Sequence, residues 1–405
     1  MPRIDEGTIN QVVINQAISN QPTSNQPMSN HHPMSNQPMI NQVEPWIDDS
    51  ELQQLARVVD SSFVVEHELT REFESMTARL SGAKHAIAVC NGTMGLFVCL
   101  KALGIGAGDE VIVPDLTFVA TANAVILAGA RPVFCEIRGD TFCIDVIRAA
   151  ALVTDRTRAI MPVHLYGQSA DMGEIQAFAG RYGLRVVEDA AQGVGVRFRG
   201  QHVGTFGDCG VLSYYGNKTI TCGEGGVVLT GNDSLAKAIY RLKNHGRDLK
   251  GTFIHDTIGF NFSFTEMQAA VGLAQMKKLP AIIARKREIR DRYCEELSGL
   301  SRFREVYLDP RCEPVFWFTS FLCDDTETLA AFLATRKVQT RRFFYPLHLQ
   351  PCYADGTTAH FAAEGFATSE SAYAQGISLP SSYGLSGQEQ AYVIEQIRLF
   401  YDNRV

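Results

Sequence analysis

The sequence has little of what membrane-spanning and secreted proteins use. No apolar run reaches the roughly 18 residues of a transmembrane helix, and no hydrophobic stretch comes after Arg3 as in a secretory signal peptide. None of the ten cysteines is spaced CxxC, and several, such as Cys90, Cys99 and Cys135, lie in apolar runs. We therefore expect reduced thiols rather than disulfides, no metal site, and a cytoplasmic protein.

The chain also lacks a strong excess of positive charge. Its net charge of −7 and pI near 5.8 argue against nucleic acid or an anionic membrane surface as a partner. The 405 residues exceed the usual size of a single core, so the length predicts one large and one small domain.

The first part of the chain, residues 1–45, has low complexity, because the text SNQP occurs three times in it. Segments rich in Asn, Gln, Ser and Pro bury too little apolar surface to offset their ordering entropy, so this composition predicts a flexible tail. The adjacent His31 and His32 are not expected to bind a metal.

Short apolar strands alternate with helical segments over most of the chain beyond residue 80. This alternation predicts a mainly parallel sheet with helices on both faces and ligands at the strand ends. The expected strands are 86–90, 110–114, 132–137, 159–164 and 184–188, and the expected helices are 94–103, 144–152 and 171–182. We assign residues 46–280 to this large domain. A smaller C-terminal α/β domain is expected over 281–405, with a strand at 316–323 and helices at 327–336 and 387–401.

Asn91, Gly92 and Thr93 stand between the first expected strand and its helix. The N–H groups at a helix N-terminus bind anions, and glycine lets a phosphate approach closely, although a plain helix cap would have the same text. A second Gly-rich stretch at 104–108 comes after a helix and before a strand, which is the wrong order for a dinucleotide-binding loop.

An acid and an amine end two later apolar runs. Asp189 comes after one of them, and Lys218 after another, with glycines close behind it. Taken singly, each is more often a turn residue or a surface residue. Together at neighbouring strand ends they suit pyridoxal phosphate (PLP), which needs a lysine to form a Schiff base and a carboxylate to keep its pyridine nitrogen protonated.

Three stretches of the sequence are similar to motifs of a known family. They are EDAAQ from Glu188, SYYGNKTITCGEGG from Ser213 and GFNFSFTEMQAAVGLAQ from Gly259. They resemble the DegT/StrS-type sugar aminotransferases of the aspartate aminotransferase superfamily, and the likeness runs from about Val59 to the C-terminus. It implies the fold type I PLP architecture, with a mainly parallel seven-stranded sheet and a smaller C-terminal domain. It also implies a catalytic lysine at Lys218, where relatives that dehydrate carry histidine.

The resemblance also implies a role for each remaining cofactor residue. Gly92, Thr93 and Ser213 would hold the phosphate, and Phe118 would stack on the ring. Asp189 would bind the ring nitrogen, and Gln192 would lie near the ring oxygen. Asn261 matches an asparagine that reaches the cofactor of the other subunit, which implies a homodimer with shared active sites.

The resemblance is closest to the perosamine synthase-like branch. It implies transfer of an amino group from L-glutamate to a nucleotide-linked 4-keto-6-deoxyhexose for surface polysaccharide. A free oxidised keto-sugar acid, such as an 8-oxo-3-deoxy-octulosonate, is the alternative acceptor. A PLP-dependent sugar dehydratase and a non-enzymatic regulator on the same fold are disfavoured by the presence of Lys218 and Asp189.

Four residues are candidates for substrate contact. His164 lies at a strand end in PVHLYGQ. It could face the active site or be a buried core histidine, and the sequence favours neither. Arg341, Tyr345 and His348 lie in TRRFFYPLHLQPCY, which resembles the family's C-terminal substrate segment. Arginine side chains suit planar carboxylate or phosphate groups, so Arg341 or its neighbour Arg342 could bind one.

Overall fold

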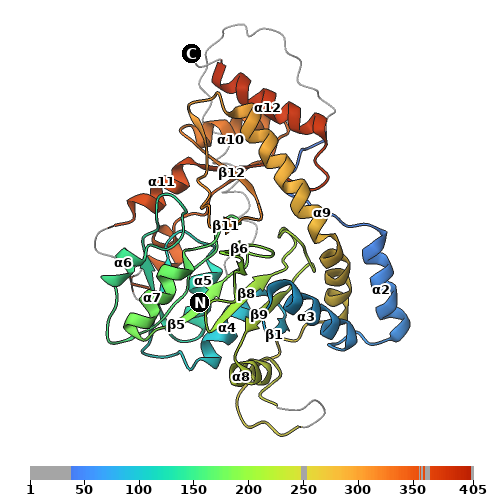
Figure 1. Cartoon of the computed structure of the whole chain (residues 1–405), viewed down its shortest axis with the longest axis vertical. Helices are drawn as coiled ribbons and strands as arrows, with labels where there is room; N and C mark the ends of the chain where they lie inside the picture. The colour runs from blue at the N-terminus through green and yellow to red at the C-terminus, as the bar shows by residue number, and fades with distance from the viewer. Residues whose placement is uncertain (1–37, 248–252, 355, 357–358, 361–364, 403–405) are drawn as a thin grey trace, which may run out of the picture. The chain divides into compact units, whose positions relative to one another are not determined.

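The computed structural model describes residues 38–247, 253–354, 356, 359–360 and 365–402 (Figure 1). The expected flexible tail lies mostly outside the described residues, and its boundary near residue 45 stays a prediction, although the chain already packs from Ile40. Ile40 is buried, pairs with Val338 and donates its N–H to the Lys337 carbonyl at 2.8 Å. The buried Gln42 accepts a hydrogen bond from the Ser381 N–H. The chain is therefore anchored from Ile40 onward.

A seven-stranded sheet forms the larger part of the molecule. Its order is β1 (His85–Val89), β9 (Gly226–Thr230), β8 (Cys209–Ser213), β5 (Arg185–Asp189), β4 (Thr157–Ile160), β2 (Glu110–Pro114) and β3 (Arg131–Cys135). Neighbours from β8 to β3 are parallel, and β9 alone runs antiparallel to both of its neighbours. This arrangement confirms the predicted mainly parallel sheet.

The strands are buried on both faces, as the continuous apolar runs predict for a parallel sheet. Successive side chains alternate between faces, so Val111 and Val211 join one core cluster while Ile112 and Leu212 join others. Helices α4 (Gly92–Ala102), α5 (Ala120–Leu127) and α8 (Asp233–Lys243) contribute to the first cluster, and α3 (Glu68–Ser81), α6 (Val146–Ala150) and α7 (Met172–Tyr182) to the others.

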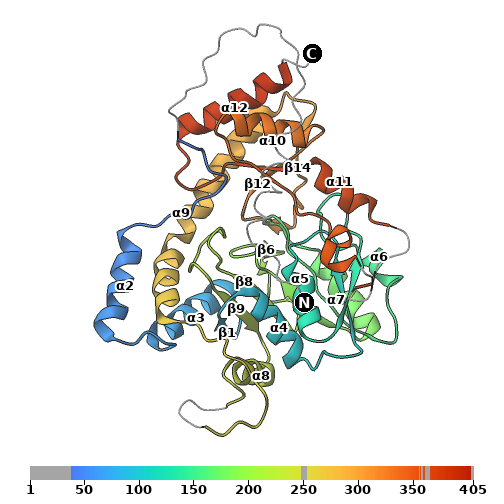
Figure 2. The same cartoon turned by 180° about the vertical axis from the view of Figure 1, so that it is seen from behind.

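Helix α9 (Glu266–Leu297) connects this sheet to a second core. Figures 1 and 2 show it running from the sheet past β12 toward α12, with α2 (Asp49–Ser61) alongside its first half. Pro280 lies inside α9, so the expected domain boundary at 280 falls within a continuous helix. The division into 46–280 and 281–405 stays a prediction.

The second core surrounds a four-stranded antiparallel sheet. Its order is β10 (Phe303–Glu305), β12 (Thr319–Cys323), β14 (Gly376–Leu379) and β13 (Arg341–Arg342). Helices α10 (Thr326–Thr335), α11 (Ala367–Gln375) and α12 (Gly387–Asp402) accompany it. Two short 3-10 helices, Leu347–Leu349 and Pro351–Tyr353, come after β13, and a small sheet joins β11 (Cys312–Glu313), β6 (Arg197–Phe198) and β7 (Gln201–His202). No helix in the described ranges is long and apolar enough to cross a bilayer.

The parallel strands β2, β5 and β8 all point their carboxyl ends to one edge of the large sheet. Asp115, Asp189 and Ser213 lie at those ends. The fold therefore gathers at one edge side chains that are far apart in the sequence.

Candidate active site

A glycine-lined cradle lies where α4 begins. A Cβ on Gly92 would lie 3.3 Å from the Cβ of Ser213 and 3.5 Å from its Oγ, so the hydroxyl stands directly beside the helix start. Asn91 caps α4 by accepting a hydrogen bond from the Met94 N–H at 2.9 Å. The first N–H groups of a helix have no partner within it, so those of Gly92 and Thr93 can bind an anion together with Ser213.

The acid is held in one orientation. Asp189 is 5% exposed, its Oδ2 accepts the hydroxyl of Thr121 at 2.7 Å, and its Oδ1 accepts the N–H of Ala191 at 3.1 Å. Thr121 belongs to α5 and also contacts Thr117 at 3.0 Å between the hydroxyl oxygens. Thr121 was not among the residues predicted from the sequence, and it fixes the carboxylate without altering its charge.

The amine lies in the connection between β8 and β9. Lys218 is half-buried, and burial lowers the pKa of its amine to about 8. The Asp189 carboxylate acts in the opposite direction, and the Arg341 guanidinium lowers the pKa further. Both charges are therefore close enough to act on Lys218, and more of the amine is neutral near pH 7 than in an exposed lysine.

Two more predicted residues, one exposed and one buried, carry groups suited to a flat ring. Phe118 is 56% exposed, although it is a large aromatic side chain, and it touches Phe344 at 5.9 Å between ring centroids. Gln192 is buried and its Oε1 accepts the Tyr166 N–H at 2.7 Å, which leaves its amide nitrogen as the donor. Phe118 thus offers an apolar face and Gln192 a hydrogen-bond donor, which are the groups that a flat polar ring needs.

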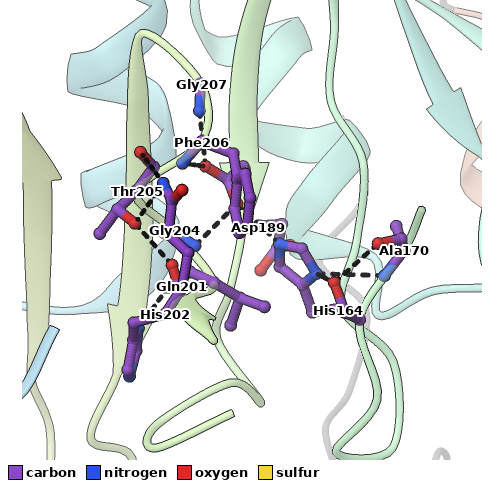
Figure 3. A network of polar contacts seen from close by, with 12 residues as sticks. His164, Ala170, Asp189, Gln201, His202, Gly204, Thr205, Phe206 and Gly207 are labelled. Carbon is purple, nitrogen blue, oxygen red and sulfur yellow. Dashed lines mark hydrogen bonds and ion pairs between the residues drawn. The ribbon is translucent and has the colours of Figure 1, made fainter. Parts of the chain in front are cut away.

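His164 does not belong to this set, and its assignment as a substrate residue is corrected by the structure. The side chain is fully buried, and its Nδ1 accepts the Ala170 N–H at 3.2 Å. Its Nε2 then carries the proton and donates to Glu188 at 2.9 Å. Figure 3 shows this network, in which Glu188 also accepts backbone N–H groups of the loop 204–207. His164 is the core histidine of the alternative interpretation.

The two neighbouring arginines differ in what they contact. Arg341 is exposed, lies 5.2 Å from the Phe318 ring centroid and acts on the pKa of Lys218. Arg342 instead lies 4.1 Å from the ring centroid of Tyr373 and donates to the Tyr373 carbonyl at 3.2 Å. Adjacent residues of a strand point to opposite sides. Arg341 is therefore the one directed toward the amine.

His348 lies between two carboxylates. Its Nδ1 is 2.7 Å from Asp115 Oδ2, its Nε2 is 3.3 Å from Glu370, and its ring stacks on Phe366. Burial opposes protonation of the ring, but the two carboxylates outweigh it and raise the pKa of His348. Tyr345, 40% exposed, lies nearby in the sequence. Their substrate roles stay predictions.

Asn261 lies on the connection between α8 and α9 and is exposed. It forms an isolated bridge with Asn244, and the next residue, Phe262, accepts the Cys90 N–H at 3.1 Å. The loop therefore packs beside the α4 cradle, and the exposed Asn261 side chain accepts the Ser263 N–H at 3.4 Å.

An anion cradle, an aromatic face, a fixed acid and a half-buried lysine at one sheet edge fit the phosphate, ring, ring nitrogen and aldehyde of PLP. On this architecture they define the class of PLP-dependent aminotransferases. The DegT/DnrJ/EryC1/StrS aminotransferase family matches residues 45–398, and the chain belongs to this family. The predicted cofactor and transaminase class are confirmed, and the enzyme is a PLP-dependent sugar aminotransferase acting on small molecules.

Relatives and solved structures agree with this assignment. The chain is 36% identical over 365 residues to GDP-perosamine synthase of Escherichia coli O157:H7, covering 89% of this chain and 98% of that protein. It is 37% identical over 349 residues to GDP-perosamine synthase of Caulobacter vibrioides, covering 84% and 93%. The structure of S. venezuelae DesV with a ketimine intermediate superposes with a TM-score of 0.84 at 32% identity, covering 90% and 99%.

Proposed function

We propose that the enzyme moves an amino group from L-glutamate to the keto carbon of a nucleotide-linked 4-keto-6-deoxyhexose that is later built into a surface polysaccharide. The observation that carries the amino transfer is the half-buried Lys218 acted on by both Asp189 and Arg341. The nucleotide-linked acceptor is supported by the perosamine synthase relatives, which align over nearly their whole length. A free keto-sugar acid is the alternative acceptor.

The residues divide the chemistry among them. PLP, when bound, supplies an electron sink for the substrate's carbon. The N–H groups at Gly92 and the hydroxyl of Ser213 would bind its phosphate, and Asp189 would keep a proton on its ring nitrogen. Lys218 would hold the cofactor covalently, and its neutral amine, once free, would act as the base that takes a proton from the substrate carbon.

The direct test is spectroscopic. The purified enzyme with PLP is expected to show a visible absorbance band that L-glutamate removes, and the correct keto sugar is expected to restore it. GDP-linked 4-keto-6-deoxymannose and a free oxidised octulosonate are compared as acceptors. If the nucleotide-linked sugar fails and the acid restores the band, the acceptor proposal is wrong. If L-glutamate leaves the band unchanged, the donor proposal is wrong.

Arg341 is expected to bind the carboxylate of L-glutamate, because it is exposed and directed toward the amine. Arg341→Met should raise the KM for L-glutamate by about 10- to 100-fold, the loss of one or two charge-assisted hydrogen bonds. Steady-state kinetics at varied L-glutamate measures this. Arg342→Met is the matched control, because Arg342 packs on Tyr373. Equal effects of the two substitutions would contradict the assignment.

We also propose a cytoplasmic homodimer in which Asn261 completes the partner's phosphate site. Exposed apolar side chains on the same connection, Phe253 at 84% and Ile258 at 85%, support burial of this loop against another copy. The large PLP-binding domain would span 46–280 and the small C-terminal domain 281–405.

Mixing two inactive variants tests the shared site. Lys218→Ala and Asn261→Asp, unfolded and refolded together, are expected to recover about a quarter of wild-type activity, because half the dimers are mixed and each has one intact site. Lys218→Ala mixed with Asp189→Asn is the control, since both residues belong to the same chain's site and no intact site can form. Recovery in neither mixture would contradict the sharing of sites.

A further inference from the structure

Trp317 contacts the amine of Lys218, although it was not among the predicted site residues. The Lys218 Nζ lies 3.9 Å from the centroid of the Trp317 ring, and Trp317 is 3% exposed. It immediately precedes Phe318 and β12 of the smaller sheet. This distance is well within the range at which an aromatic face attracts an ammonium group.

The Trp317 ring is held at one edge and on one face. Its Nε1 donates to the carbonyl of Asn217, the residue before Lys218, at 2.6 Å. The ring also stacks on Phe318, with centroids 3.8 Å apart and planes 22° apart. The indole therefore cannot turn away without breaking a hydrogen bond to the segment that carries Lys218.

The backbone of Trp317 is held by a buried lysine of α9. Lys286 is 3% exposed and donates to the carbonyls of Trp317 at 3.1 Å and Ser381 at 3.0 Å. Within the described ranges no carboxylate lies at ion-pair distance from Lys286, and burial lowers its pKa to about 8. A buried ammonium with only carbonyl partners is costly. It is explained by what it fixes, which is the backbone at Trp317, just before β12, and at Ser381, just after β14.

We propose that Trp317 is a positioning residue for Lys218, that its ring face stabilises the ammonium form in which Lys218 carries the proton, and that Lys286 holds this ring in place. The other groups acting on Lys218 are charged, Asp189 from β5 and Arg341 from β13, and they act in opposite directions. The ring adds a neutral contact that favours the protonated amine and disappears if the ring moves.

The test is the titration of Lys218 in the protein without PLP. Trace acetylation of the Lys218-containing peptide at a series of pH values, read by mass spectrometry, gives the midpoint of its ionisation. Trp317→Leu is expected to increase the acid ionisation constant by about 3- to 30-fold, the range for a desolvated cation–π contact. Trp317→Phe, which keeps a weaker face, is expected to give a smaller change in the same direction.

Substitution of Lys286 distinguishes a positioning role from a direct electrostatic effect, because the two change the pKa of Lys218 in opposite directions. Removing a nearby positive charge would by itself raise the pKa of Lys218, whereas displacing the ring lowers it. Lys286→Met is therefore expected to lower the midpoint, and Lys286→Arg is expected to leave it near that of the wild type. An unchanged midpoint in folded Trp317→Leu, or in Trp317→Phe if the leucine variant does not fold, would overturn the role of Trp317. A raised or unchanged midpoint in Lys286→Met would overturn the role of Lys286.

This inference rests on the proposed role of Lys218, but different measurements test the Trp317 contact and the catalytic role of Lys218. The midpoint is measured without cofactor or substrate, so it reports the Trp317 contact even if another group does the chemistry. The role of Lys218 is tested by its own substitution.

Discussion

Lys218→Ala is expected to reduce amino transfer from L-glutamate by at least about four orders of magnitude, because a covalent attachment and a general base are lost together. The variant should still bind PLP through the α4 cradle and Asp189, but without a covalent bond. Gel filtration should then strip the cofactor from the variant and leave it on the wild type. Steady-state rates and the PLP content after filtration measure the two effects.

A second lysine provides the control. Lys84 has a side chain that is 57% exposed and forms an ion pair with Asp233 at 2.7 Å. Lys84→Ala is expected to change neither the rate nor the PLP content, since an exposed ion pair contributes little. Substantial transamination by Lys218→Ala would contradict the assignment of the amine.

The sequence predicted the parts of the site that are encoded within a few residues. The cradle at Gly92, the acid at Asp189 and the amine at Lys218 each come after an apolar strand, and strand ends of a parallel sheet meet at one edge. The family was predicted from the three stretches that begin at Glu188, Ser213 and Gly259, and the sheet from the alternation of apolar strands with helices. Their mutual placement needed only the topology, which the alternation of strands and helices predicted.

Contacts between distant segments were not predictable in this way. Trp317 lies just before β12 of the smaller sheet, about a hundred residues after Lys218, and nothing in VFWF marks one aromatic residue as the partner of an amine. Thr121 is likewise one of several hydroxyl residues around its helix. Such pairs depend on side-chain direction and packing, which single-sequence patterns do not contain.

His164 also shows that side-chain direction is not predictable from the sequence pattern. Its position at a strand end was predicted, but not the direction of its ring. Glu188 and Asp189 are adjacent on β5 and point to opposite faces of the sheet. Asp189 faces the site, and Glu188 faces the core, where a buried carboxylate needs donors. The two adjacent acids in EDAAQ were the available signal. They indicate that one of the two carboxylates is buried in the core and needs a donor from another segment, which is His164.

The early anchoring at Ile40 has a similar cause. Ile40 is one apolar residue beside a tract of Asn, Gln, Ser and Pro, and composition averages it away. Its burial comes from pairing with Val338, about three hundred residues later. Composition predicts whether a long segment can fold alone. It does not predict that a single side chain of the segment is buried against a distant part of the chain.

Asp189→Asn is expected to lower the turnover rate by about two to three orders of magnitude, the usual loss when one preorganised electrostatic partner is removed. The substitution should leave the fold intact, because the asparagine oxygen can still accept the Ala191 N–H and its amide nitrogen can donate to the Thr121 hydroxyl. What disappears is the negative charge that, in the proposed function, would keep the cofactor's ring nitrogen protonated. The loss should therefore appear in the turnover rate, with the KM for L-glutamate nearly unchanged.

Thr121→Val separates the charge of Asp189 from its orientation. Valine keeps the shape of the side chain and removes the hydroxyl that donates to Asp189 at 2.7 Å. The carboxylate keeps its charge and its bond to Ala191, so the rate should fall by only about tenfold, the value of one hydrogen bond to a charged group. Thermal unfolding of both variants checks that neither loss reflects instability. If Asp189→Asn were no more harmful than Thr121→Val, the charge would not be what the reaction uses, and the pairing of Asp189 with the ring nitrogen would have to be abandoned.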